Sequence, residues 1–525
     1  MTRRHQVIIV GGGPVGVALA VELGLRGIDC ALVERYREPQ RIPKGQNLAP
    51  RTLEHFQRWG IVDALRAERL MPPGIPVSGI VAYGDLTSPY WYAPPQREIV
   101  RPYYFQDVER LPQYLMEKVL RAKMAELACV EARFGWSAES IAQDADGVRA
   151  TIAERDGKAR AVLEADYLVG CDGGHSTVRD QAGIARGGAD FDQLMVLAVF
   201  RSRALHERLE RFPLRSTYNA LHPDLKGYWQ FFGRIDVGEG WFFHAPVPAD
   251  TTKDNYDFHG LVQRAAGFPF PCEFDHVGFW DMRVAVAERY RAGRVFIAGD
   301  AAHSHPPYGG FGLNSGLEDA VNLGWKLAAR LSGWGSDALL ASYGAERRPI
   351  FVETGRDFIA GRIASDREFL ERFRPDRDRA AFEAAWNARA AGMGERLMTY
   401  EPHYEGSPVV HGPPGAVSSA HGAHSYAARA GHHLAPRPLS AGRDLFAELG
   451  AGFALLAFDA DPAPFLDAAR GLGVPLTAVR DSFDGGREAF AARLVLVRPD
   501  QYVAWTGDRA PADAGAVLMK AVGRA

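Results

Sequence analysis

The sequence predicts an α/β fold in three parts: a Rossmann-type domain with a parallel sheet, an inserted mixed or antiparallel β-sheet domain, and a small C-terminal α/β domain. Three observations predict it. The chain opens with a strand, a glycine loop, a helix and a second strand; its middle holds aromatic-rich β-type runs; and short apolar runs alternate with helical runs after residue 426. A length of 525 residues is enough for about three domains.

Composition narrows the class of protein. With 47% hydrophobic and 24% charged residues, the chain is typical of a soluble globular protein. A net charge of −3 and the lack of long Lys/Arg runs exclude a nucleic-acid surface. We expect neither a membrane span nor a signal peptide, because the apolar run VIIV breaks at once into GGGP. Four widely spaced cysteines favour a reduced, cytoplasmic protein.

The first forty residues contain the strongest local pattern. VIIV is a short β-branched run that predicts a buried strand, and the apolar spacing that follows predicts a helix. Gly11, Gly13 and Gly16 satisfy GxGxxG, and the second strand, ALVE, ends in Glu34 at the position expected for a ribose-binding carboxylate. Glycine lets the backbone approach a pyrophosphate, which the helix N-terminus attracts. The pattern predicts a dinucleotide site without separating FAD from NAD.

Two later stretches share the form of a strand that ends in an acidic turn. YLVG leads into Asp172 in CDGGHSTVR, and RVFIAG leads into Asp300. After Asp300 comes a proline-stiffened glycine turn, and then a run with apolar residues at helical spacing. The start of that helix would offer free N–H groups to an electron-rich group. His303 and His305 lie between, and we expect them to pack and hydrogen-bond within this loop rather than bind a metal.

GDAAHSHPPYGGFGLNSGLEDAVNLGWKL resembles a motif of the class A flavin monooxygenases, the aromatic hydroxylases, and the two earlier motifs match this family in order and spacing. LVRPDQYVAWTG resembles the thioredoxin-like extension of the phenol hydroxylase branch. The resemblance implies an FAD-binding domain and NADPH or NADH as a transient reductant. It also implies that O₂ adds at flavin C4a and that the resulting hydroperoxide oxidises a small aromatic substrate. We find no second GxGxxG after a strand, so a permanent nicotinamide domain is not expected.

The resemblance also implies site residues. The matching cofactor-binding positions are Gly11, Gly13, Pro14, Val15, Gly16, Glu34, Arg35, Lys44, Gln113, Asp172, Asp300, Pro307, Gly310, Gly312, Leu313 and Asn314. Lys44 stands where the family has an arginine, so the bidentate fork is lost. The chain has GGFGLN where the family commonly has GGQGMN, so Phe311 either removes a polar contact or simply packs.

Candidate catalytic residues follow from the same resemblance. Arg283 matches an arginine near flavin and phenol, with a sheet-edge salt bridge as the alternative. Gln46 falls near the branch's phenol-activating aspartate, but glutamine is not a base. His244 and Tyr228 are then the candidate bases, unless the substrate is more acidic or needs no deprotonation. In GYWQFFGRI, strand alternation places Trp229 and Phe231 on the face opposite Tyr228.

The predicted domains are as follows: an FAD-binding domain over 1–75, 100–188 and 283–370; a substrate-binding β-sheet domain over 76–99 and 189–282; a linker over 371–425; and a thioredoxin-like domain over 426–525. The last contains no cysteine, which excludes thioredoxin-like redox chemistry and favours a packing or homodimer role. Rival functions are epoxidation or Baeyer–Villiger insertion, a flavin-dependent halogenase suggested by GWFFHAP, and a non-catalytic flavoprotein.

Overall fold

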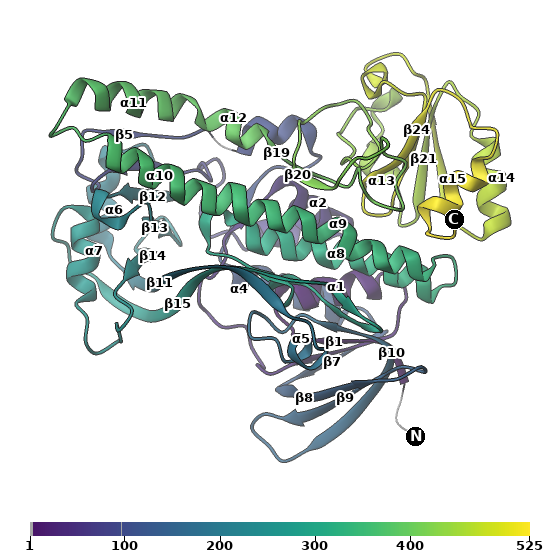
Figure 1. The fold of residues 1–525 in the computed structure, drawn as a ribbon, viewed down its shortest axis with the longest axis horizontal. Helices are drawn as coiled ribbons and strands as arrows, with labels where there is room; N and C mark the ends of the chain where they lie inside the picture. The colour runs from purple at the N-terminus through teal and green to yellow at the C-terminus, as the bar shows by residue number, and fades with distance from the viewer. Residues whose placement is uncertain (1–3, 96) are drawn as a thin grey trace.

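The computed structural model describes residues 4–95 and 97–525, and within them three sheets define three parts of the molecule (Figure 1). The first sheet contains β1 (Arg4–Val10), β2 (Cys30–Glu34), β7 (Val130–Phe134), β8 (Trp136–Gln143), β9 (Val148–Glu154), β10 (Arg160–Gly170), β16 (Arg291–Ala292) and β17 (Val295–Ile297). The second contains β4 (Ile80–Tyr83), β5 (Trp91–Tyr92), β11 (Arg186–Arg201), β12 (Thr217–Leu221), β13 (Gln230–Arg234), β14 (Gly240–Val247), β15 (Glu273–Ala287) and β18 (His303–Ser304).

The first sheet has the Rossmann-type arrangement that the sequence predicts. Its order is β16-β17-β10-β1-β2-β7, and β1 runs parallel to both β2 and β10. VIIV lies in β1 and is buried on both faces, which explains its continuous apolar character. Helices α1 (Pro14–Gly24), α4 (Gln113–Ala125) and α8 (Phe311–Leu331) pack beside it. The loops after β1, β2, β10 and β17 therefore leave the same edge of the sheet, because these strands are parallel.

Most strands of the second sheet come from the two ranges assigned to the inserted domain, but β11 begins at Arg186, β15 continues to Ala287, and β18 lies in a range assigned to the FAD-binding domain. Its order is β18-β15-β11-β14-β13-β12-β4-β5, largely antiparallel, with β4 parallel to β12. Phe232 and Phe243 enter the core that this sheet forms with α6 (Arg203–Arg208) and α7 (Phe258–Ala266). Trp229 and Phe231 line the cavity on the opposite side, as the sequence predicts, and Phe242 lines it with them.

The predicted linker over 371–425 is not a plain connection. It contains α11 (Arg379–Ala391), α12 (Met393–Met398), β19 (Tyr400–His403) and β20 (Ser419–His421). Phe382 and Trp386, one helical turn apart, are buried against the ring of Tyr83. With α10 (Gly361–Arg372), these helices run along the upper edge in Figure 1. Two aromatic side chains suffice to bind an otherwise alanine- and arginine-rich helix to the second sheet.

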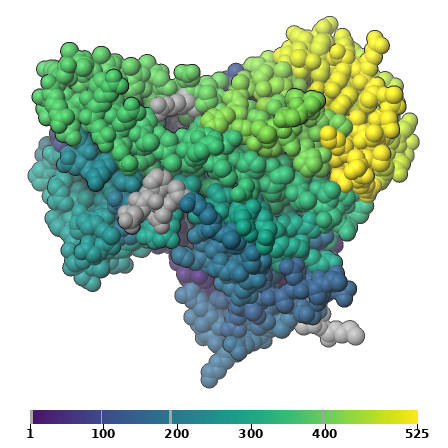
Figure 2. All heavy atoms as spheres, viewed as in Figure 1, coloured from purple at the N-terminus to yellow at the C-terminus, as the bar shows by residue number. Residues whose placement is uncertain are grey.

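The C-terminal part is a small α/β unit, as predicted. Strands β21 (Phe453–Phe458), β22 (Leu476–Asp481), β23 (Leu494–Val497) and β24 (Val503–Gly507) form one sheet beside α14 (Ala463–Leu472) and α15 (Ala514–Ala521). It shares a core with α8 and α9 (Asp337–Glu353) through Trp325 and Leu339. It forms the yellow lobe at one end of the molecule in Figure 2. The thioredoxin likeness of this unit stays a prediction. Among the described residues, no helix is long and apolar enough to cross a membrane.

Candidate active site

A cavity of about 1250 Å³ opens at the carboxyl edge of the first sheet, against the second sheet. Its lining includes the loops that contain Gly13, Glu34, Asp172 and Asp300, together with aromatic residues of β13, β14 and β15. Sites for a single drug-sized ligand measure about 300–1000 Å³. This cavity is therefore large enough for a cofactor and a second molecule. It brings all three sequence motifs to one place.

The glycines of the first loop meet three different requirements. Gly11 has φ +105°, and a Cβ on it would lie 2.3 Å from the Cys171 carbonyl oxygen in the second motif. A Cβ on Gly16 would lie 1.9 Å from the Gly11 oxygen, so that glycine serves close packing and does not line the cavity. A Cβ on Gly13 would meet nothing within 4 Å, and Gly13 lines the cavity with Pro14 and Val15. The loop thus leaves space where a pyrophosphate would lie.

Glu34 closes this end of the cavity. Its Oε2 accepts a hydrogen bond from the Gly12 N–H at 2.6 Å, and its Oε1 accepts one from the Tyr36 N–H at 2.8 Å. Arg35 and Lys44 also line the cavity, and Lys44 donates to Gln40 at 3.0 Å. The carboxylate is fixed at the end of β2, where it can accept ribose hydroxyls.

Helix α4 contributes one face to the cavity. Gln113 begins the helix and donates to Glu117 at 2.7 Å. Arg121, one turn further, donates to the Gly12 carbonyl at 3.5 Å. The family motif indicates only Gln113, although the spacing of four residues places Gln113, Glu117 and Arg121 on one face of the helix.

The second and third motifs are joined by hydrogen bonds. Asp172 accepts from the Ser176 hydroxyl at 2.5 Å and the Val178 N–H at 3.1 Å, which fixes the turn after β10. Arg179 donates to the carbonyls of Gly174 at 3.0 Å and Ala301 at 3.3 Å. The turn that contains Asp300 is therefore held against the turn after β10. The Asp300 side chain is exposed to the cavity.

The two histidines of the third motif pack, as expected. His303 is paired with Asp319 at 2.6 Å and stacks on Phe351 with ring centroids 4.0 Å apart. His305 bonds to the Pro306 carbonyl at 2.5 Å, and burial lowers its pKa to about 4. Neither belongs to the one metal-like cluster among the described residues, which is formed by residues 403, 405 and 432.

Helix α8 begins at the cavity. Gly310, with φ +67°, is its N-cap, and Gly312 and Leu313 line the cavity, as does Pro307. No side chain caps this end, and the helix dipole places partial positive charge beside the cavity, where it would attract an anionic ring edge. Phe311 does not line the cavity and packs on Tyr400 at 4.7 Å. Of the two alternatives for Phe311, the structure supports packing.

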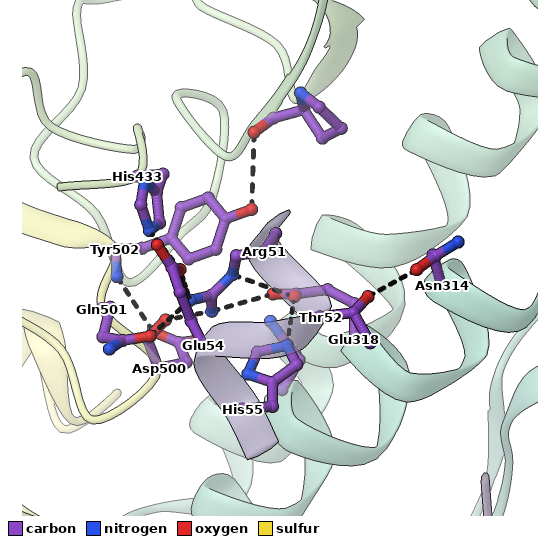
Figure 3. Close-up of polar contacts among 12 residues, drawn as sticks. Arg51, Thr52, Glu54, His55, Asn314, Glu318, His433, Asp500, Gln501 and Tyr502 are labelled. Atoms are coloured by element: carbon purple, nitrogen blue, oxygen red, sulfur yellow. Dashed lines mark hydrogen bonds and ion pairs between the residues drawn. The ribbon is translucent and has the colours of Figure 1, made fainter. Parts of the chain in front are cut away.

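Asn314 does not line the cavity and holds the start of α8 to a neighbouring segment instead. It donates to the carbonyls of Asn47 at 3.0 Å and Gly310 at 2.6 Å. It accepts from the Ala49 N–H at 2.8 Å and the Thr52 hydroxyl at 2.6 Å (Figure 3). Its side chain is thus a positioning group for the 47–52 segment.

Thr52 begins a buried polar network that crosses to the C-terminal unit (Figure 3). Arg51, from α2 (Pro50–Arg58), pairs with Glu318 at 3.1 Å and Glu54 at 2.9 Å. It also donates to the Asp500 carbonyl at 2.5 Å and to the side chain of Gln501. Helix α2 is therefore bound directly to the loop between β23 and β24.

The remaining wall of the cavity is aromatic. It contains Trp229, Phe231, Phe242, Phe279 and Trp280. These side chains come from or directly precede β13, β14 and β15. Because they contribute little hydrogen-bonding capacity, this part of the cavity suits a planar apolar ring.

The protein families that match this chain agree with this geometry. Residues 4–355 match the family described as FAD binding domain, and residues 427–525 match the family described as aromatic-ring hydroxylase, C-terminal. The chain belongs to the FAD-dependent aromatic-ring hydroxylases. It is a flavin-dependent monooxygenase, and FAD is its cofactor.

Individual relatives of this hydroxylase cover nearly its full length. Tetracenomycin B2 monooxygenase-dioxygenase of Streptomyces olivaceus is 32% identical over an alignment of 553 positions that covers 98% of this chain and 97% of the relative. The rebeccamycin biosynthetic enzyme RebC with bound 7-carboxy-K252c superposes with a TM-score of 0.87 at 29% identity. Aklavinone-11 hydroxylase with FAD and aklavinone gives 0.83 at 26%. Both structures cover 100% of each chain.

Only some of the predicted catalytic residues of the hydroxylase line the cavity. Arg283, Gln46 and His244 line the cavity. Tyr228 does not: β13 begins only at Gln230, and Tyr228 packs in a separate apolar cluster. The assignment of Tyr228 to the site is therefore corrected.

His244 is a weak base. Burial lowers its pKa to about 3, against a partly compensating hydrogen bond to the Val196 backbone. Its Nδ1 is buried and has no hydrogen-bond partner among the described residues. We therefore regard it as a hydrogen-bonding group rather than a proton acceptor for a phenol. Arg283 is half exposed and is paired with Asp281 at 3.7 Å.

Proposed function

We propose that this hydroxylase uses NAD(P)H and O₂ to place one oxygen atom on a phenolic or related aromatic ring. The balance is one ring C–H, O₂, NAD(P)H and a proton giving ring C–OH, water and NAD(P)⁺. The observation that carries the proposal is the single large cavity, which joins the three FAD motifs to an aromatic wall. Its relatives support a polycyclic substrate, since one is a tetracenomycin B2 monooxygenase-dioxygenase and another binds aklavinone.

Different residues of the chain would bind different parts of the cofactor. Gly13 and Glu34 would hold the ADP part of FAD, and Gln113 and Asp300 the ribityl chain that leads to its ring. The positive end of the α8 dipole would stabilise negative charge on the ring edge. Bound FAD supplies the oxygen-activating chemistry after reduction by NAD(P)H.

The aromatic wall would exclude water and orient the substrate ring. Arg283 would stabilise negative charge on the substrate oxygen from the cavity edge. No described carboxylate takes the place of Gln46, so the chain supplies no obvious base there. A substrate that ionises easily agrees with this arrangement.

The test is a screen of phenols and polycyclic aromatics for stimulated NADPH or NADH consumption by the FAD-loaded enzyme, with ¹⁸O₂ and product mass. We expect one labelled oxygen in the product. Arg283→Met should lower kcat by about 100-fold, while Arg289→Met, at a half-exposed surface position, should not. No stimulation across the panel contradicts the proposal and favours a non-catalytic flavoprotein.

The same assay separates the rivals. Product structure distinguishes hydroxylation from epoxidation or Baeyer–Villiger insertion. Chloride-dependent product would indicate a halogenase. Against that rival, Phe243 of the GWFFHAP stretch is fully buried in the core on the far face of the second sheet.

A further inference from the structure

Arg110 is a buried guanidinium group in the wall of the cavity. It ends β6 (Glu109–Arg110), which pairs with β3 (Asn47–Leu48), and it is 5% exposed. Its Nη2 donates to the Gln46 side chain at 3.0 Å and to the Arg234 carbonyl at 2.8 Å. Its Nε and Nη1 are buried and have no hydrogen-bond partner in the described part of the chain. Two donors of a cation are thus left unsatisfied beside an open cavity.

The charged residues described around Arg110 do not compensate its positive charge. The residue before it, Glu109, is paired with Arg69 at 2.8 Å rather than with Arg110. The charged group that acts on Arg110 is Arg234, which has the same sign and is itself buried. Burial and then Arg234 lower the pKa of Arg110 to about 9, so it is still a cation at neutral pH. A buried cation without an anion is strongly unfavourable, which points to an anionic ligand.

Other polar atoms without a described hydrogen-bond partner lie near Arg110, around the ring of Phe242. The Arg110 guanidinium is 5.7 Å from the centre of the Phe242 ring, which is 5.7 Å from the ring of His244. His244 is in turn 5.9 Å from Trp280. The Gln46 Nε2, His244 Nδ1 and Trp280 Nε1 atoms are all buried without a described partner. Each of these residues lines the cavity.

These groups belong to the second sheet and to the β3–β6 pair, not to the glycine loops that would hold the ADP part of the cofactor. The donors face the aromatic wall, where the substrate ring would lie under the function proposed above. The ligand they fit is a planar ring with a negatively charged oxygen attached.

Resting on that proposed function, we propose that Arg110 binds an ionised oxygen of the aromatic substrate, either a carboxylate or a phenolate. The cation would select ionised substrates and, for a phenol, would favour loss of its proton to solvent on binding. It would thus supply electrostatically what Gln46 cannot supply as a base. Arg110 is then a specificity-determining residue of the site.

Binding to the FAD-loaded enzyme tests this without turnover. Changes in flavin absorbance would be titrated with anthraquinone-2-carboxylate and with its methyl ester. In Arg110→Gln, we expect the acid to bind about 10- to 100-fold more weakly and the ester to bind unchanged. Arg110→Lys keeps the charge and should recover part of the loss; it also serves if Arg110→Gln folds poorly.

A second probe examines the phenolate. Alizarin changes colour on ionisation, so absorbance gives the pKa of the bound dye. We expect that pKa to be about 1–3 units lower in the wild type than in Arg110→Gln, as for an acid beside an opposite charge. If only the affinity for the acid depends on Arg110, the subsite binds a carboxylate. If only the pKa of the bound dye depends on Arg110, the subsite binds a phenolate. Either result supports the inference.

Two results would overturn it: Arg110→Gln changes neither the affinity for the acid nor the pKa of the bound dye, or it weakens the acid and its methyl ester equally and leaves the pKa of the bound dye unchanged. Loss of FAD from Arg110→Gln would assign the cation to the cofactor phosphates and also overturn it. Arg379→Gln, on an exposed side chain of α11, is the control for loss of one positive charge. Since no product is needed, acid binding can succeed even if the proposed hydroxylation fails.

Discussion

Asn314→Ala tests how the start of α8 is held beside the flavin. The side chain makes four hydrogen bonds to residues 47–52 and to Gly310, between 2.6 and 3.0 Å. Each contributes about 1 kcal/mol net, and a buried donor left without a partner costs about 1–3 kcal/mol. Water from the adjacent cavity can replace some of the four. We therefore expect a loss of about 2–4 kcal/mol in the free energy of unfolding.

The assay is urea unfolding of the enzyme with and without FAD, together with the dissociation constant of FAD from ultrafiltration. Thr52→Val removes one of the four bonds and should cost about 1 kcal/mol. In the double variant the two losses should not add, because both changes remove the same Thr52–Asn314 bond. Asn314→Ala should also weaken FAD binding, since the loop and helix start are no longer fixed together. A stability within about 0.5 kcal/mol of wild type would refute this reasoning.

Three further outcomes are expected. Gly11→Ala should purify without FAD, because its Cβ would lie 2.3 Å from a backbone oxygen; Gly27→Ala, at φ +73° with nothing within 4 Å, should keep the flavin absorbance of wild type. Glu346→Gln should lower the free energy of unfolding by about 3–5 kcal/mol in denaturant titration, since it leaves the buried Arg498 guanidinium, at 2.7 Å, short of one anion. Burial alone would raise the pKa of Glu22, but two neighbouring arginines outweigh it and lower the pKa to about 2. The stability this contributes is present above pH 4.5 and is lost as the pH falls towards 2, so Glu22→Gln should flatten the acid limb of Tm against pH.

Much of the fold and of the cofactor site could be predicted because strong local patterns encode them. The VIIV strand, the GxGxxG turn and the acidic strand ends each predict a loop at one sheet edge, and parallel pairing brings those loops together. The alternation of Trp229 and Phe231 with Phe232 correctly separates the cavity face from the core face.

What could not be predicted depends on long-range contacts. Arg110 has no spacing signature, and its importance appears only when no described acid is found beside it in the folded chain. Tyr228 lies away from the site: alternation already places it on the face opposite Trp229 and Phe231, and it packs in a separate apolar cluster. The helix with Phe382 and Trp386 was missed because only two of its residues are buried. Composition therefore suggested a linker.

The Arg51 network bears on any attempt to build chimeric hydroxylases. In this network Arg51 of α2, the helix that adjoins the flavin loop, donates hydrogen bonds to the Asp500 carbonyl and the Gln501 side chain. His433 is paired with Glu54 of the same helix at 2.8 Å. Cutting the gene near residue 426 would leave Arg51 and Glu54 facing solvent or a mismatched partner. Exchange of the last hundred residues between relatives should yield holoenzyme only when the donor segment brings equivalent groups. Recombination boundaries in this family are therefore better chosen by matching this junction than by following the domain map.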